Sequence, residues 1–229
     1  MKKRKQNLTS NIAPTRQPLS RDGLACEALR LIDEKGLEGF SMRQLGARMG
    51  VEAMAIYYHF KDKGQLLDAV LEKLIEELGL DEALPPLERL RQHMESIRQV
   101  AINHPRAFML MAARRFNTAY AFVFYERLLG TFAELGLDAL GAARWFRLIG
   151  GCVIGAGLAE AASREQIPDA TALLLERSPD QIAYPRVRAV ANHLRVDQLE
   201  SNFAFSMDIL FDALARQLRN ADHAPGHGF

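Results

Sequence analysis

Three side chains that can bond to phosphate stand together at residues 57–59, within the segment SMRQLGARMGVEAMAIYYHFKDKGQLL (41–67). Tyr57 and Tyr58 carry hydroxyl groups and His59 carries ring nitrogens, and all three groups can bond to phosphate oxygens of DNA. The same side chains also suit the edge of a small hydrophobic core, with their polar tips in water. The cluster by itself leaves both interpretations open.

Cationic side chains and helix N-termini flank this cluster and favour the DNA interpretation. Arg43 precedes it and Lys63 follows it, while Ser41 and Asp62 are typical N-cap residues of helices, whose N-termini attract phosphate. Small residues at the start of a helix let its backbone approach base edges in the major groove. The predicted DNA-contacting residues are Ser41, Arg43, Ala53, Met54, Ala55, Tyr57, Tyr58, His59 and Lys63.

Helices with recognisable ends are predicted to position these residues. Ser20 caps a first helix, which ends at Gly36. Ser41 and Gln44 form a capping box that opens a second, short helix, which ends at Gly50.

A third short helix is expected over residues 53–59, and a second capping box, Asp62 with Gln65, opens a fourth helix over residues 63–78. Two short helices joined by a Gly-containing turn have the dimensions of a helix-turn-helix. We therefore expect the third helix to lie in the DNA major groove.

The helix-turn-helix is expected to enclose a small apolar core. We expect Ile56 to face Leu45 and Met49, and Phe60 with one of the two tyrosines to close the small core.

The stretch LIDEKGLEGFSMRQLGARMGVEAMAIYYHFKDKGQLLDAV resembles the DNA-binding domain of the tetracycline-repressor (TetR) family. The segment KGLEGFSMRQLGARMGV matches the first two helices and the turn, and IYYHFKDKGQLL matches the recognition helix and the start of the fourth helix. The resemblance covers roughly residues 19–79. It implies that Arg43, the residues from Ala53 to His59, and Lys63 approach DNA.

One residue departs from the family pattern. Glu52 stands where many members have Ser or Thr as the cap of the recognition helix, and a carboxylate that faces phosphate is unfavourable. We expect Glu52 to point away from DNA, toward Arg43 or Arg48.

Composition and charge narrow the class of protein. The chain has 229 residues, of which 48% are hydrophobic and 25% charged, as is typical of a globular protein with one large domain or two modest ones. The net charge is +1, but residues 1–63 hold 12 Lys/Arg and 7 Asp/Glu, whereas residues 64–229 hold 17 and 21. This asymmetry predicts an anionic partner for the front part alone.

Other classes of function are not favoured. Cys26 and Cys152 have no metal-ligand spacing, so we expect no metal site. The apolar run LIGGCVIGAGLA (148–159) is too short to span a bilayer, and the N-terminus has no signal-peptide core, so we expect a cytoplasmic protein without a membrane partner. We find no nucleophile elbow, HExxH motif or nucleotide-binding loop, so we expect neither an enzyme nor a cofactor.

Helical patterns continue through the rest of the chain. They predict helices over residues 87–103, 106–114, 118–135 and 139–162, and a last helix opened by Asp197 with Glu200.

The resemblance implies a homodimer built by the last two long helices of each subunit, and the residue types agree with this. Small residues on the helix over 139–162 allow another helix to approach closely, and the last helix has more apolar surface than one core face needs. A crowded core within one subunit is the alternative. The predicted interface residues are Gly151, Gly155, Phe203, Met207, Leu210 and Leu214.

The resemblance also implies a small-molecule pocket in the second domain, enclosed by the helices over 87–103, 118–135 and 139–162. Apolar and aromatic residues on these helices predict a mostly apolar or aromatic effector with few charges. Each candidate also suits core packing or a solvated face. The predicted ligand-binding residues are His93, Met94, Ile97, Arg98, Phe116, Asn117, Tyr120, Phe124 and Trp145.

Together these features predict an all-α, ligand-responsive transcriptional repressor that binds a palindromic DNA operator as a homodimer and is released by a small-molecule effector. Effector binding is expected to shift the fourth helix and to weaken DNA binding. A DNA-binding activator or architectural factor without an effector is the alternative. The expected organisation is a disordered basic arm (1–18), a helix-turn-helix DNA-binding domain (19–79), a helical effector-binding and dimerisation domain (80–220) and a disordered tail (221–229).

Overall fold

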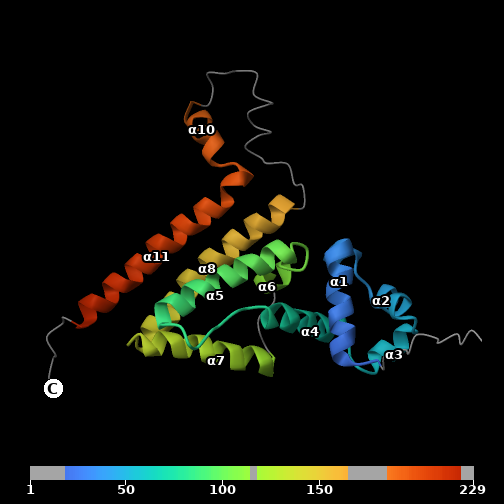
Figure 1. Cartoon of the computed structure of the whole chain (residues 1–229). Coiled ribbons are helices and arrows are strands. Elements are labelled where there is room, and N and C mark those ends of the chain that lie inside the picture. The colour runs from blue at the N-terminus through green and yellow to red at the C-terminus, as the bar shows by residue number, and fades with distance from the viewer. Residues whose placement is uncertain (1–18, 114–117, 165–184, 223–229) are drawn as a thin grey trace, which may run out of the picture.

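The computed structural model describes residues 19–113, 118–164 and 185–222, and every α-helix or 3-10 turn named below lies in these ranges (Figure 1). Helices are the regular elements of these ranges, so the predicted all-α class is confirmed. The predicted arm (1–18) and most of the predicted tail (221–229) lie outside them, and α11 extends to Asp222.

The N-terminal unit contains four helices, which Figure 1 shows in blue to teal. They are α1 (Arg21–Gly39), α2 (Met42–Met49), α3 (Ala53–Tyr57) and α4 (Lys63–Glu76). The body of the protein contains α5 (Pro86–Asn103), α6 (Met109–Ala113), α7 (Ala119–Glu134), α8 (Ala139–Arg164), α10 (Pro185–Val190) and α11 (Leu199–Asp222), with short 3-10 turns at Ala191–His193 and Val196–Gln198.

The N-terminal caps predicted at Ser20 and Asp62 are confirmed, whereas the cap predicted at Asp197 is wrong, because Asp197 lies in the 3-10 turn Val196–Gln198 and α11 begins at Leu199. The Ser20 hydroxyl accepts from the backbone N–H of Gly23 at 3.0 Å, and the Asp62 carboxylate accepts from the N–H of Gln65 at 2.8 Å. The end of α1 differs from the prediction, because the backbone leaves helical geometry at Gly36 (φ 76°, ψ 167°) but the element resumes and continues to Gly39.

The core of the N-terminal unit is closed by two phenylalanines. Phe40 and Phe60 are buried, together with Leu45 and Ile56. The expectation that one tyrosine helps to close this core is wrong, because Phe40, which joins α1 to α2, fills the space instead and both tyrosines are exposed.

A glycine sets the separation of α2 and α3. A Cβ atom at Gly46 would lie 2.8 Å from the carbonyl oxygen of Val51, in the turn between the two helices. The turn itself begins at Gly50, whose backbone is left-handed (φ 65°, ψ 34°). Only glycine permits this close approach and this turn at low cost.

The body is built around α5 and α8, which lie side by side, with α7 beneath them and α11 along α8 (Figure 1). The Trp145 indole of α8 donates to the Gln217 side chain of α11 at 3.1 Å. Among the described residues, α8 is the one helix long and apolar enough to span a membrane, but one side of it packs against α5, α7 and α11.

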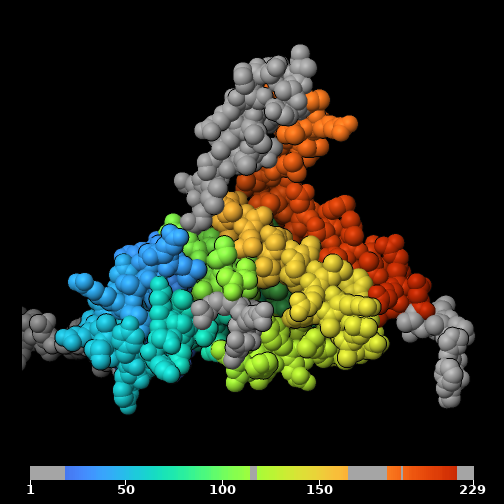
Figure 2. Space-filling view, turned by 180° about the vertical axis from the view of Figure 1, so that it is seen from behind, coloured from blue at the N-terminus to red at the C-terminus, as the bar shows by residue number. Residues whose placement is uncertain are grey.

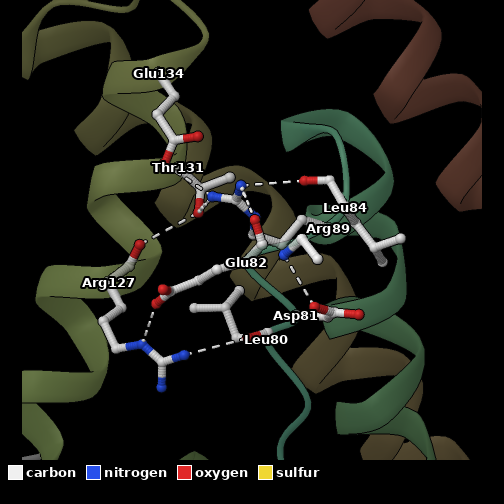
Figure 3. A network of polar contacts seen from close by, with 9 residues as sticks. Leu80, Asp81, Glu82, Leu84, Arg89, Arg127, Thr131 and Glu134 are labelled. Carbon is white, nitrogen blue, oxygen red and sulfur yellow. Dashed lines mark hydrogen bonds and ion pairs between the residues drawn. The ribbon is translucent and has the colours of Figure 1, made fainter.

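The connector between α4 and α5, residues 77–85, is held in place by hydrogen bonds and ion pairs from arginines of the body (Figure 3). Arg89 of α5 donates to the carbonyl oxygens of Glu82 and Leu84, both at 3.1 Å, and pairs with Glu134 of α7 at 2.8 Å. Arg127 of α7 donates to the Leu80 carbonyl at 3.2 Å and pairs with Glu82 at 2.7 Å. The predicted domain boundary at residues 79 and 80 therefore falls in a segment that is tied to α5 and α7.

A second link joins the body to the N-terminal unit. His104, at the C-terminal end of α5, lies 2.7 Å from a carboxylate oxygen of Asp33 in α1 through Nδ1, and 2.9 Å from one of Glu77 through Nε2. Ionised carboxylates only accept hydrogen bonds, so this arrangement favours the charged imidazole, in which both ring nitrogens carry protons. These two carboxylates, Asp33 first, raise the pKa of His104 above its ordinary value.

This link makes stability depend on pH. Because the folded-state pKa of His104 is raised, its stabilising contribution is fully present below about pH 6.5 and is lost as pH rises through the folded-state value. We expect His104→Asn to lower the free energy of unfolding at pH 6 and to narrow its difference from the parent protein as pH rises. Urea unfolding from pH 6 upward measures this. His193→Asn, at an exposed histidine, is the control, and a pH-independent loss in His104→Asn would contradict the prediction.

Candidate nucleic-acid interface and ligand cavity

The third helix presents an unusually exposed aromatic and apolar face. The side chains of Tyr58, Met54 and Tyr57 are 89%, 73% and 43% exposed. Ala53, Ala55 and His59 are half-buried, and the rings of Tyr58 and His59 are 5.5 Å apart at nearly a right angle. Large apolar side chains on a helix of a small domain are exposed at a cost, so this face suits a surface that meets another molecule.

The cationic residues that flank α3 differ in how firmly they are held. Lys63 donates to the carbonyl oxygen of Phe40 at 2.8 Å and its ammonium lies 5.2 Å from the Phe40 ring centre. Arg43 is exposed and makes no hydrogen bond or ion pair with any residue of the described ranges. The Ser41 hydroxyl accepts from the N–H of Gln44 at 3.3 Å, so it caps α2 as predicted.

Glu52 pairs with neither Arg43 nor Arg48, the two arginines toward which it was expected to point. It is the N-cap of α3, makes no capping bond through its side chain, and is exposed. Arg48 instead pairs with Glu27, at 2.6 Å, and with Glu34, both in α1. The expected contact to Arg48 is wrong because α1 supplies two carboxylates on the side that Arg48 faces.

Sequence reasoning missed Arg21 at this surface. Its guanidinium donates to the backbone carbonyl of His59 and stacks 4.2 Å from the centre of the Phe60 ring. Arg21 therefore fixes the end of the recognition segment from α1. The contact joins residues far apart in the sequence, so no local pattern reveals it.

A cavity of about 90 Å³ lies between α5, α7 and α8. Its walls are almost entirely apolar or aromatic, with His93 and Tyr125 as the residues that carry polar groups. Burial raises the pKa of Tyr125, so its hydroxyl stays protonated. The lining residues are Leu78, His93, Met94, Ile97, Met111, Phe124, Tyr125, Leu128, Phe132, Phe146, Ile149, Gly150, Val153 and Ile154.

The structure brings four of the residues predicted for ligand binding into this cavity, namely His93, Met94, Ile97 and Phe124. Sequence reasoning missed most of the other lining residues, because helix periodicity gives the buried face of a helix but not which part of it borders a void.

Three of the predicted ligand-binding residues lie elsewhere. Arg98 turns to α8, where its guanidinium bonds to Glu160 at 2.6 Å and 2.8 Å, and both side chains are buried. Trp145 faces α11, and Tyr120 is 42% exposed. Phe116 and Asn117 lie outside the described residues.

His93 is the polar anchor of the cavity wall. It is fully buried, and its Nδ1 lies 2.9 Å from the carbonyl oxygen of Gly79, just beyond the end of α4. Burial lowers the pKa of His93 to about 4, so the ring is neutral at physiological pH. Among the described residues, no group of three or more His, Cys, Asp or Glu side chains could hold a metal ion.

The residues predicted for a dimer interface divide into two groups. Gly151 and Gly155 are exposed on α8, with open space where a Cβ would stand. Phe203, Met207 and Leu214 of α11 are instead buried within the subunit, and Leu210 is half-buried. The prediction is wrong for Phe203, Met207 and Leu214, because these side chains pack on α5 and α8 within the subunit and have little surface left for a partner.

The apolar residues that α8 and α11 leave exposed are different ones. On α8, Leu140 and Leu148 fall in helical register with the two open glycines, and on α11 Phe205 and Ile209 are 66% and 50% exposed. Figure 2 shows α8 (yellow) and α11 (red) side by side at the surface of the molecule.

A helix-turn-helix with an exposed recognition helix, joined to a helical body that holds an apolar cavity, defines a DNA-binding transcriptional regulator. Two family models match the chain: bacterial regulatory proteins of the tetR family over residues 27–70, and the tetracyclin repressor-like C-terminal domain over residues 87–218. The chain belongs to the TetR family of transcriptional regulators.

Curated relatives match over part of their length. The tetracycline repressor protein class C of Escherichia coli is 42% identical over 57 residues, which are 25% of this chain and 26% of that protein. An HTH-type transcriptional regulator of Saccharopolyspora erythraea is 27% identical over 154 residues, 66% of this chain and 65% of that protein. Both matches span less than two thirds of the relative.

Solved structures match over almost their whole length. A possible TetR family regulator from Streptomyces coelicolor is 25% identical, with a TM-score of 0.75 over 86% of this chain and 99% of that chain. ActR from the same organism, in complex with actinorhodin, is 22% identical, with a TM-score of 0.74 over 88% and 99%. At that identity the likeness to ActR shows the fold alone.

Arg43 gives a direct test of the DNA surface, because it has no bond within the described residues to lose. We expect Arg43→Ala to weaken binding to many DNA sequences alike and to reduce the slope of log affinity against log salt by about 1, as the loss of one phosphate contact requires. Fluorescence anisotropy over a salt series measures this slope.

Arg219→Ala removes the same charge from an exposed position near the end of α11, far from α2 and α3 (Figure 1), and is the matched control. Equal slopes for the two variants would remove Arg43 from the phosphate contacts.

Proposed function

We propose that this protein is a cytoplasmic, ligand-responsive repressor that binds a near-palindromic operator as a homodimer and releases it when a small molecule occupies the cavity. The observation that carries the DNA part is the exposed face at α3, with Tyr58 at 89% exposure, together with the exposed guanidinium of Arg43 on α2, the helix that packs against α3. Tyr hydroxyls and an Arg guanidinium at a recognition helix suit phosphate contacts, while Ala53 and Ala55 leave the helix start close to base edges.

The proposed DNA residues keep the set derived from the sequence. They lie in α3 or directly after it, in α2 and its N-cap, and at the start of α4, namely Ala53, Met54, Ala55, Tyr57, Tyr58, His59, Arg43, Ser41 and Lys63. Lys63 has one hydrogen bond to Phe40 and retains further N–H donors for phosphate, since an ammonium carries three.

The effector part is supported by the cavity. One of its lining residues, Leu78, lies just beyond α4, the helix that joins the DNA-binding unit to the body, so occupation of the cavity acts on the segment between α4 and α5. A ligand that binds one position of α4 better than another would shift the separation of the two recognition helices in a dimer and thereby lower DNA affinity.

Selection from a random pool of DNA duplexes tests this function whatever the operator sequence is. We expect the parent protein to enrich an inverted repeat with half-sites about one helical turn apart, bound by two chains per duplex. Enrichment of no motif, or of a motif without two-fold symmetry, would contradict the proposal.

The proposed dimer face is the surface of α8 and α11 that carries Leu148, Gly151, Gly155, Phe205 and Ile209. Apolar residues exposed next to open glycines suit helices that pack closely against a second copy.

A charge on this face should separate the subunits. We expect Phe205→Asp to sediment as a monomer at concentrations where the parent protein is a dimer, because a carboxylate would be buried without a partner. Phe122→Asp on α7 is the matched control, since Phe122 is 63% exposed and Phe205 is 66% exposed. Dissociation by both variants, or by neither, would place the interface elsewhere.

A further inference from the structure

One polar atom in the cavity wall lacks a partner. His93 donates through Nδ1 to the Gly79 carbonyl at 2.9 Å, and a carbonyl can only accept, so Nδ1 holds the proton of the neutral ring. The other nitrogen, Nε2, is buried and has no hydrogen-bond partner among the described residues. It is therefore a buried hydrogen-bond acceptor without a donor, and such an unsatisfied group lowers the stability of the folded protein.

The surroundings of Nε2 define what can satisfy it. The cavity wall is aromatic and aliphatic, with the Phe124 ring 5.2 Å from the His93 ring. None of the lining residues carries a charge at neutral pH, and the nearby buried cation, Arg98, is already paired with Glu160. A charged ligand would lose its hydration here without a counter-charge, so the site favours a neutral molecule.

We propose that the effector is a small, uncharged molecule with an aromatic or apolar body and one hydroxyl or N–H group, which donates a hydrogen bond to Nε2 of His93. A cavity of about 90 Å³ holds more than one water molecule and suits a compact ring. This inference rests on the proposed function, because it names the class of ligand for the proposed effector cavity.

The same imidazole connects the ligand to α4. A donor at Nε2 fixes the tautomer in which Nδ1 donates, and it polarises the ring so that the bond to Gly79 strengthens. Gly79 is further held by its own N–H, which donates to the Ser96 hydroxyl at 3.1 Å, and it lies in the connector that Arg89 and Arg127 hold in place (Figure 3). His93 is thus a positioning residue for the end of α4 as well as a ligand contact.

Two probes of equal shape test the ligand class. p-Cresol and p-xylene differ in a single hydroxyl in place of a methyl group. We expect the parent protein to bind p-cresol about tenfold more tightly than p-xylene by ligand-observed NMR, since only p-cresol satisfies Nε2. The ¹⁵N resonance of Nε2 in histidine-labelled protein should shift with p-cresol and stay unchanged with p-xylene.

Two variants separate the two roles of the ring. His93→Asn places an amide N–H near Nδ1, so it keeps the bond to Gly79 but loses the acceptor in the cavity. His93→Gln places an amide oxygen near Nε2, so it keeps the acceptor but loses the bond to Gly79. We expect the preference for p-cresol to vanish in His93→Asn and to survive in His93→Gln.

Hydrogen exchange reports the link to α4. In the parent protein p-cresol should slow exchange of the amides of residues 77–80, and in His93→Gln it should bind without this protection. Circular dichroism confirms that each variant is folded, and if neither folds, the Nε2 resonance of the parent protein decides alone.

Several results would overturn the inference. These are failure of p-cresol to bind, equal affinity for the two probes, an unchanged preference for p-cresol over p-xylene in His93→Asn, or an Nε2 resonance that does not shift when p-cresol is added. A parent protein that enriches an inverted repeat but ignores p-cresol would refute this inference alone and leave the proposed function in place. A parent protein that prefers p-cresol but selects no DNA motif would refute the proposed function and leave the predicted ligand class in place.

Discussion

The connector between α4 and α5 has no helix or strand, so most of its backbone carbonyl groups lack the hydrogen-bond donors that a regular element would supply. Side chains of α5 and α7 supply them: His93 for Gly79, Arg127 for Leu80, and Arg89 for the two carbonyls beyond. The position of α4, and with it the DNA-binding unit, is therefore fixed by helices that border the cavity.

Two histidines at different places along α5 hold the end of α4 in opposite protonation states. His93 is surrounded by apolar side chains, which disfavour its charged form, so it is neutral and has one donor. His104 lies between the carboxylates of Asp33 and Glu77, which favour the charged form, so it has two donors. The environment, and not the residue type, leaves His93 of the cavity wall with an acceptor nitrogen that has no partner among the described residues, and lets His104 bridge to α1.

Local sequence determined much of the DNA-binding unit. The caps at Ser20, Ser41 and Asp62 and the turn at Gly50 depend on residues at most a few positions apart, so their spacing predicted the helix starts and the helix-turn-helix correctly. The all-α class followed for the same reason, since helix periodicity is a local property of the chain. The choice of which aromatic closes the small core was not local, and Phe40 took the place expected for a tyrosine.

Tertiary structure alone decided the contacts between helices. The pairing of Arg98 with Glu160, the bridge from His104 to Asp33 and the bond from His93 to Gly79 each join residues on different elements, and no spacing in the sequence indicates them. Periodicity marks the apolar side of a helix. Successive residues, however, point about 100° apart around the helix axis, so a small rotation of the helix decides whether a residue borders a cavity, packs against a neighbour or is exposed. Only the mutual rotation of packed helices sets that angle, because it depends on how all their side chains fit together at once.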